Sequence, residues 1–262
     1  MSQPDRMEHE VDFWGHRMMS LDECIAEFRT GMGTNTRFAI DRLEPLAGRT
    51  VLDFACGQGI TSCLLAVRGA KVIGVDVTPQ AVEAAAALAE ALELAVEFRC
   101  GDLLRMNDLP VFDRMFGRYA LHHVDVPRYG RRLSKLLNEQ GWGTFLETSV
   151  TNPMLALARR FGAGRLGVAR YGSDDERPLS YRDLRTLRQI FGYAQDVVPE
   201  MSFLRILDRN VFRRRSPVLT GACELVDDKL SEIPHLQWLS YHRVVVVARQ
   251  PVALPTWHSG VG

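Results

Sequence analysis

Two glycines and two aspartates in the first third of the chain have the types and spacing of a nucleotide-binding turn. Gly57 and Gly59 follow an apolar run at residues 51–54 and precede a helical apolar spacing, which predicts a strand, a tight turn and a helix start. Such a turn lets backbone N–H groups approach a ligand closely, and the helix N-terminus adds partial positive charge. Asp76 ends a second apolar strand about 20 residues further on, where doubly wound sheets place the carboxylate that binds a ribose.

The elements around this turn alternate between strands and helices. An alanine-rich helix is expected over 79–92 and a third strand over 95–100, and this βαβ order implies a parallel sheet. Ahead of the first strand, Ser20 and Glu23 form a capping box that predicts a helix over 21–30. Gly31 and Gly33 should end that helix, and a second helix passes through Phe38, Ile40 and Leu43.

The composition is that of a globular protein without a dominant charge. The chain has 262 residues, 46% of them hydrophobic, and its formal net charge is zero, so no global field favours nucleic acid or an anionic membrane. Five cysteines without regular spacing indicate reduced thiols, and no apolar run approaches the ~18 residues of a membrane span. The N-terminus is too acidic and polar for a signal peptide, so we expect a cytoplasmic protein that binds neither nucleic acid nor membrane; a homodimer stays open.

The motif D-x-x-C-G-x-G, from Asp53 to Gly59, resembles the class I S-adenosylmethionine-dependent methyltransferases. A nicotinamide-binding fingerprint would carry glycine or alanine at the position that Ser62 holds. Ala55 replaces the first glycine of the family's pattern, so its backbone is expected to hold a conformation that an L-residue tolerates. Cys56 is expected to be a small packing residue and not a nucleophile.

The resemblance implies S-adenosylmethionine as cofactor, with its methionine part over the two glycines. It places Asp53 near the ammonium group of the cofactor and Asp76 on the ribose hydroxyls. Asp102 would accept a hydrogen bond from the adenine amine, although a helix cap is the alternative. The complete set of expected cofactor-binding residues is Asp53, Ala55, Cys56, Gly57, Gly59, Asp76, Val77, Gly101, Asp102, Leu103 and Arg118.

Two adjacent histidines follow the expected fourth strand and its exit loop, residues 112–124. Ligands of open α/β sheets bind outside the carboxyl ends of strands, so His122 or His123 could take a proton from a hydroxyl or ammonium as the methyl group arrives. One of the pair could instead be structural. We favour His123 because it lies farther along the exit loop. No spacing of acids and histidines resembles a metal site.

Substrate residues are expected on both sides of this edge. In the family, helices ahead of the first strand commonly close over cofactor and substrate, so Phe13, Trp14 and His16 could line such a lid, or simply pack in the core. Glu147, near the end of the fifth strand, could orient a substrate amine or hydroxyl, or pair with an arginine. Tyr119 and Arg160 complete the expected substrate residues.

The expected fold is α/β: a doubly wound, mostly parallel seven-stranded sheet with an antiparallel last strand. Residues 1–46 would form a helical lid and 47–262 the catalytic domain, with cap insertions at about 151–178 and 203–240. The arginines of the insertions could bind a carboxylate or phosphate of a substrate. A solvated charged face is the simpler reading of them, because acidic residues lie nearby in the sequence.

The expected activity is methylation of an oxygen or nitrogen nucleophile of a small molecule, as in natural-product or cofactor tailoring. A protein that binds the cofactor without methylating, such as a cyclase or a regulatory module, would share the same turn and acid. A nucleic-acid or protein methyltransferase is disfavoured, because the fourth strand runs into RYALHH and not into an Asn/Asp-Pro-Pro-Tyr/Phe sequence.

Overall fold

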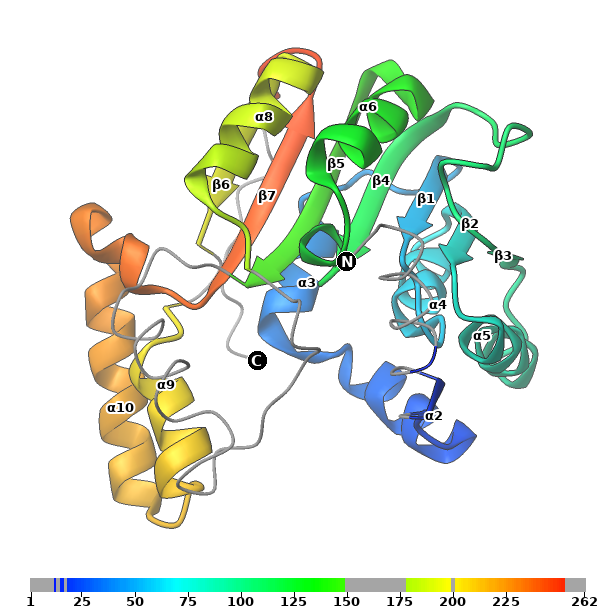
Figure 1. The fold of residues 1–262 in the computed structure, drawn as a ribbon. Helices are drawn as coiled ribbons and strands as arrows, with labels where there is room; N and C mark the ends of the chain where they lie inside the picture. Colours follow the sequence, from blue (N-terminus) through cyan, green and yellow to red (C-terminus); the bar gives the residue numbers. More distant parts are fainter. Residues whose placement is uncertain (1–11, 13–14, 17, 149–177, 199–200, 253–262) are drawn as a thin grey trace.

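The computed structural model describes residues 12, 15–16, 18–148, 178–198 and 201–252. Its sheet has seven strands in the order β3-β2-β1-β4-β5-β7-β6 (Figure 1). The strands are β1 (Thr50–Phe54), β2 (Lys71–Asp76), β3 (Glu97–Cys100), β4 (Phe112–Arg118), β5 (Leu137–Thr148), β6 (Tyr193–Val197) and β7 (His242–Ala248). The helices are α2 (Leu21–Thr30), α3 (Gly33–Asp41), α4 (Ile60–Val67), α5 (Pro79–Ala91), η1 (Leu121–His123), α6 (Val126–Leu136), α8 (Tyr181–Phe191), α9 (Leu204–Leu207), η2 (Asp208–Phe212), α10 (Pro217–Ser231) and η3 (Pro234–Leu239).

The pairing of the strands confirms the expected α/β fold. Strands β1 to β5 pair in parallel, whereas β7 pairs antiparallel with both β5 and β6. A strand covered on both faces is apolar along its length, and the four consecutive valines of the antiparallel β7 are at most 1% exposed. The switch in strand order between β1 and β4 places the carboxyl ends of these two strands beside each other, which is where ligands bind in such sheets.

Helices cover the two faces of the sheet with separate apolar cores. On one face Leu52 and Phe54 pack with residues of α6 and α8, including Leu133 and Leu187. On the other face Val51 packs with α3 and α4. The alternation of Val51 and Leu52 between the two cores follows the two-residue period of a strand. The result is a three-layer domain whose carboxyl edge is flanked by α2 and by the α9–α10 pair (Figure 1).

The N-terminal helices follow the sequence signals with one difference. The capping box at Ser20 and Glu23 is present, and Gly31 caps α2 in the left-handed conformation. Gly33, however, begins α3 and does not end α2, because Met32 adopts φ 55° and turns the chain within a single residue. Helix α3 buries Phe38 in the core beneath the sheet, so it is an integral layer of the domain.

Beyond the sheet, the described part of the expected 203–240 insertion is helical. It contains α9, η2, α10 and η3, which lead into β7. Strand β6 ends at Val197. The insertion at 151–178 lies almost wholly outside the described residues. Among the described helices, none combines the length and the apolar character that crossing a membrane requires.

Candidate active site

The turn between β1 and α4 has the open backbone that the glycines predict. Gly57 has φ +53° and Gly59 has φ +76°, both in the left-handed region. A Cβ at Gly57 would meet nothing within 4 Å, whereas one at Gly59 would lie 2.7 Å from Ala85 Cβ. Gly59 therefore serves the close packing of α4 on α5, and Gly57 leaves accessible backbone at the sheet edge.

Ala55 departs from what its residue type suggests. Its φ is +56°, so it holds a left-handed conformation that an L-residue adopts only at a cost of about 1 kcal/mol. The backbone at this position is therefore strained, which the expectation of a tolerated conformation did not indicate. The next residue, Cys56, is buried with its N–H bonded to Val75 O, and burial raises the pKa of its thiol well above the ordinary value. An un-ionised, buried thiol fits a packing role.

Asp76 connects the end of β2 to the glycine turn. Its Oδ2 accepts the Gly57 N–H at 2.9 Å and its Oδ1 accepts the Thr78 N–H at 2.9 Å. The carboxylate is half-buried. The two elements singled out by the sequence, turn and acid, thus meet in one hydrogen bond, and the acid stands beside the accessible backbone of Gly57.

Asp53 is fully buried below the turn. Its Oδ2 accepts hydrogen bonds from the hydroxyls of Thr61 at 2.7 Å and Ser62 at 2.6 Å, which fixes the first turn of α4. Burial raises the pKa of Asp53 to about 6, although both hydroxyls and the charge of Arg118 act in the opposite direction. Within the described part of the chain, the other carboxylate oxygen, Oδ1, has no hydrogen-bond partner.

The segment after β3 brings a third acid to the same edge. Gly101 has φ +144° and donates its N–H to Asp76 O at 2.8 Å, so the third acid follows directly beside the second. Asp102 Oδ1 accepts the Leu104 N–H and the Tyr129 hydroxyl, each within 2.9 Å. Asp102 therefore caps a local turn and is held by α6, while Leu103 is buried at 1% exposure.

Glu147, on β5, binds the residues that follow the end of β4. Its Oε1 accepts the backbone N–H groups of Ala120 at 3.0 Å and Leu121 at 2.7 Å, and its Oε2 lies 2.7 Å from His122 Nδ1. The carboxylate is 1% exposed. Glu147 thus fixes the position of η1 and the orientation of the His122 ring, and among the described residues its charged partner is a histidine and not an arginine.

Aromatic and cationic groups surround this pair. The His123 ring lies 4.1 Å from that of His122, centroid to centroid, and His242 lies 6.1 Å from Tyr119. Tyr119 has φ +56°, and burial raises the pKa of its hydroxyl. The Arg118 guanidinium stands 4.8 Å from the Tyr119 ring centre. The strained backbone of Tyr119 marks the point where the chain leaves the sheet.

The remaining expected residues divide into two groups. His16 is a surface residue whose side chain is 80% exposed and whose Nδ1 contacts Asp12 O at 2.8 Å. Val77 follows Asp76 and accepts a contact from the Cys100 thiol through its carbonyl. Phe13, Trp14 and Arg160 lie outside the described residues.

Several contributors carry no sequence signal that would have singled them out. Thr61 and Ser62 hold Asp53, and Tyr129 holds Asp102 from a helix 27 residues away. Gln58 exchanges two hydrogen bonds with the backbone of Met19, which fastens the segment before α2 to the glycine turn. In the sequence, Gln58 is only a polar residue at the variable position between Gly57 and Gly59, so its contact with Met19 could not be predicted.

Comparison with known proteins gives this site its class. Residues 51–141 match the family model described as a methyltransferase domain, a span that runs from β1 into β5. This span of the chain matches the class I S-adenosylmethionine-dependent methyltransferases, a family whose cofactor is S-adenosylmethionine.

Two curated relatives are O-methyltransferases. The chain is 33% identical over 143 residues to magnesium-protoporphyrin O-methyltransferase of Rhodobacter capsulatus, covering 50% of this chain and 63% of that protein. It is 32% identical over 130 residues to a ubiquinone biosynthesis O-methyltransferase of Chromobacterium violaceum, covering 47% and 54%. The chain thus spans somewhat more than half the length of each.

Solved structures share the fold. Geranyl diphosphate C-methyltransferase from Streptomyces coelicolor A3(2) superimposes with a TM-score of 0.59 at 18% identity, covering 87% of this chain and 83% of that one. A magnesium protoporphyrin IX methyltransferase from Synechocystis superimposes with a TM-score of 0.50 at 15% identity, covering 86% and 81%. At these identities the likeness concerns the fold alone.

Proposed function

We propose that this protein transfers a methyl group from S-adenosylmethionine to an oxygen nucleophile of a small molecule. The observation that carries the proposal is the hydrogen bond between Gly57 N–H and Asp76, because it joins open backbone and a ribose-binding acid at the switch point of the sheet. The two O-methyltransferase relatives support oxygen over nitrogen as the accepting atom.

The residues at the edge fit this cofactor. The space at Gly57 is clear of protein atoms within 4 Å of a notional Cβ, and Asp53 Oδ1 is a buried acceptor without a partner among the described residues. An orphaned carboxylate oxygen suits a ligand that carries an ammonium group. Asp76 would hold the ribose, and Gly101, Asp102 and Leu103 the adenine end.

His122 is the better candidate for proton acceptor, although its place in the sequence favours His123. Glu147 is bound to His122 Nδ1, so the proton on that nitrogen points to the carboxylate and Nε2 is left as the basic nitrogen. When bound, the cofactor supplies an activated methyl group that leaves its sulfur for the acceptor oxygen. His122 Nε2 takes the hydroxyl proton as the new bond forms. The His123 ring lies against that of His122 at a tilt of 37°.

Planar, ring-containing substrates are the class that we propose. Magnesium protoporphyrin and ubiquinone intermediates are named for the two relatives, and Tyr119, His123 and His242 give the exit of β4 an aromatic lining. Aromatic side chains bind flat ring systems by offset stacking. Alignment of such a ring with the methyl donor supplies much of the rate.

The test uses S-adenosylmethionine with a deuterated methyl group and a panel of phenols and aromatic carboxylic acids. Mass spectrometry should find one labelled methyl on an oxygen of at least one compound, and calorimetry should find cofactor binding in the micromolar range. Binding without transfer to any compound would favour a cofactor-binding module. Absence of binding would overturn the proposal.

A further inference from the structure

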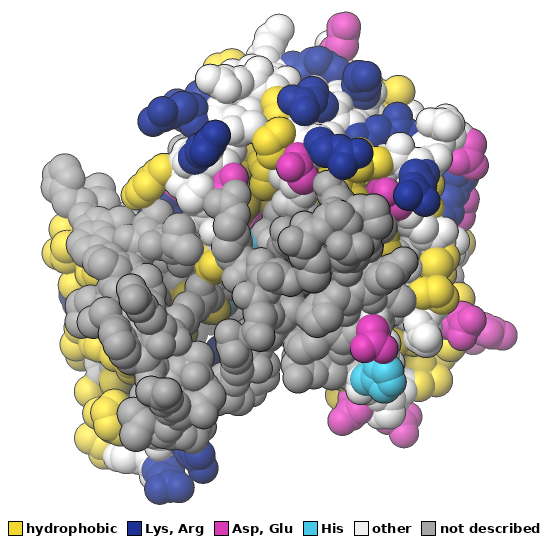
Figure 2. Space-filling view, in the orientation of Figure 1, with side chains coloured by type: hydrophobic (Ala, Val, Ile, Leu, Met, Phe, Trp, Pro, Cys, Tyr) yellow, Lys and Arg dark blue, Asp and Glu magenta, His cyan; other side chains and the backbone are white. Residues whose placement is uncertain are grey.

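The outward face of α10 is apolar. Six of the eleven exposed large hydrophobic residues among those described lie between positions 212 and 233. Four of them are on α10, at exposed fractions of 83% for Val218, 36% for Leu219, 61% for Leu225 and 44% for Val226. Figure 2 shows hydrophobic side chains along the edge of the molecule that α10 forms. Such a concentration marks an interaction surface more often than scattered exposure does.

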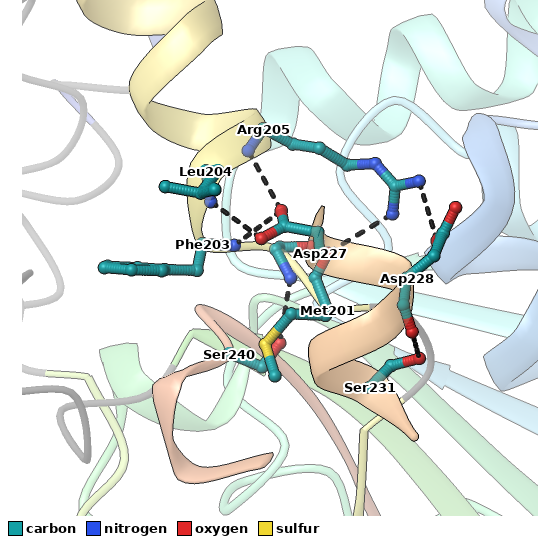
Figure 3. A network of polar contacts seen from close by, with 9 residues as sticks. Met201, Phe203, Leu204, Arg205, Asp227, Asp228, Ser231 and Ser240 are labelled. Carbon is teal, nitrogen blue, oxygen red and sulfur yellow. Dashed lines mark hydrogen bonds and ion pairs between the residues drawn. The ribbon is translucent and has the colours of Figure 1, made fainter. Parts of the chain in front are cut away.

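The inward face of α10 is polar by contrast. Asp227, fully buried, accepts the backbone N–H groups of Phe203, Leu204 and Arg205 at 2.9 to 3.1 Å (Figure 3). Thr220 donates its hydroxyl to Asp208 at 2.7 Å. The helix is thus fastened to α9 and η2 by hydrogen bonds, which is the reverse of the usual surface helix with its apolar stripe inside.

The centre and ends of the outward face suit pairing with an identical helix. Gly221, where an added Cβ would meet nothing within 4 Å, and the exposed Ala222 form a small-residue centre that permits close approach of a second helix. Exposed Arg214 and Arg215 precede the helix, whereas Glu232 follows it with its side chain 66% exposed. The first end is therefore basic, whereas at the other end the acidic Asp228 and Glu232 outnumber Lys229, which is 69% exposed and pairs with Glu232 at 3.0 Å.

We propose that α10 is the interface of a two-fold homodimer, packing antiparallel on α10 of a second copy with Ala222 near the axis. In this register Val218 of each copy meets Val226 of the other, and Leu219 meets Leu225. The basic end of each helix then lies beside the acidic end of its partner. A two-fold interface must be self-complementary, and this face is so in both shape and charge.

Charge also decides against a membrane as the occupant. A helix that lies on an anionic bilayer carries basic residues along its polar border. Beside its apolar face α10 carries Glu224 and Asp228, and Glu232 caps it, against one lysine, Lys229, so anionic headgroups would meet a net negative charge.

Sedimentation of the full chain over a range of concentrations tests the dimer. The wild type should sediment as a dimer, and Val218→Glu with Leu225→Glu should weaken dimerisation by at least about 100-fold, since each change acts twice at a two-fold interface. Val67→Glu is the matched control, because Val67 is a 60% exposed valine on α4, and it should leave the dimer intact. A monomeric wild type, or a dimer that survives the double change, would overturn the proposal. Co-flotation with phosphatidylserine vesicles that the double change abolishes would assign the face to a membrane instead.

Charge exchange tests the antiparallel register. Arg214→Glu and Glu232→Arg should each weaken their own homodimer, because like charges then meet twice. An equimolar mixture of the two variants should form heterodimers of wild-type affinity, since both contacts become complementary again. Mixing that restores nothing would exclude this register.

Oxidative cross-linking gives an independent reading of the axis. Ala222→Cys in a Cys100→Ser background, which removes the exposed native thiol, should form an intermolecular disulfide. Gln189→Cys on the exposed surface of α8 is the control and should remain uncross-linked at the same concentration. Equal cross-linking of both variants would contradict an axis at Ala222.

Discussion

The two halves of the sheet's carboxyl edge are built differently. At β1 and β2 the site is made largely of backbone: left-handed glycines, a Gly57 N–H bound by Asp76, and a buried Asp53 that accepts the hydroxyls at the start of α4. At β4 and β5 the site is made of side chains that meet across the sheet. Glu147 binds both His122 and the backbone of η1 through hydrogen bonds. The β1–β2 half fixes the shape of the glycine turn, and the β4–β5 half fixes the position of an ionisable group, the His122 ring. Shape at the turn depends on the absence of side chains, whereas proton transfer depends on one tautomer of one ring.

The largest effect is expected where a side chain enters the backbone half. Gly57→Val should abolish cofactor binding, because the new side chain occupies the space that the ligand needs. Gly48→Val is the matched control: Gly48 has φ +75° and equally open surroundings, so it carries comparable strain of about 1–3 kcal/mol without touching the site. Calorimetry with S-adenosylmethionine compares the two, and equal loss of binding would show that strain alone is responsible.

In the side-chain half, Glu147→Gln should lower turnover by about 10²- to 10⁴-fold while cofactor affinity stays unchanged. The amide oxygen can still accept the N–H groups of Ala120 and Leu121, but the amide nitrogen now donates to His122 Nδ1. The ring proton is thereby forced onto Nε2, where it blocks proton acceptance.

The pH profile separates this effect from a structural one. With His122 disabled, the remaining rate should rise with pH as the acceptor ionises unaided. His123→Ala should cost less than tenfold in turnover. A larger loss in His123→Ala than in Glu147→Gln would return the catalytic role to His123.

A smaller effect is expected on the stability of the backbone half. The pKa of Asp53, raised by burial to about 6 from an ordinary 3.8, means that the folded protein holds this proton to higher pH than the unfolded chain does. Stability is therefore lost as pH rises from about 4 to about 6, by up to about 3 kcal/mol. Asp53→Asn removes this loss and can keep both hydroxyl contacts. Urea unfolding at pH 4.5 and 7 should show that the free energy of unfolding of the variant rises relative to that of the wild type at the higher pH. An equal difference in the free energy of unfolding at both pH values would contradict the ionisation of a buried Asp53.

The smallest effect concerns Ala55. Ala55→Gly should raise the free energy of unfolding by about 0.5 kcal/mol, because relief of the left-handed strain slightly exceeds the entropy that glycine costs. Urea denaturation measures it. Ala81→Gly, within α5, should instead lower stability by about 1 kcal/mol. Destabilisation at both positions would mean that Ala55 is unstrained.

The same division explains how much could be predicted from the sequence. Glycines, strand-ending acids and the capping box at Ser20 act on their own neighbourhood, so the fold and the glycine turn follow from local pattern, whereas the hydrogen bond between Gly57 and Asp76 was not predicted. The pairing of Glu147 with His122 spans 25 residues and two strands, and the sequence left the partner of Glu147 open between a substrate group and an arginine.

Backbone conformation at single positions was the other limit. Ala55 and Met32 are both left-handed, although neither residue type indicates it, because the surrounding turns over-determine their φ. The alanine pattern correctly predicts the helix α5, whereas no pattern indicates that α10 would turn its apolar residues outward.

Two hydrogen bonds between Gln58 and the backbone of Met19 hold the segment before α2 against the glycine turn. Met19 N–H donates to Gln58 Oε1 at 2.9 Å, and Gln58 Nε2 donates to Met19 O at 2.8 Å, both in exposed surroundings. Two such bonds stabilise the closed position by about 1–3 kcal/mol in all. That is a small fraction of the free energy that holds a domain of this size together, so the segment before α2 can release the turn many times for each global unfolding event. The amide proton of Met19 should accordingly exchange with solvent far faster than those of β1, and its exchange rate should report how often the two bonds to Gln58 break.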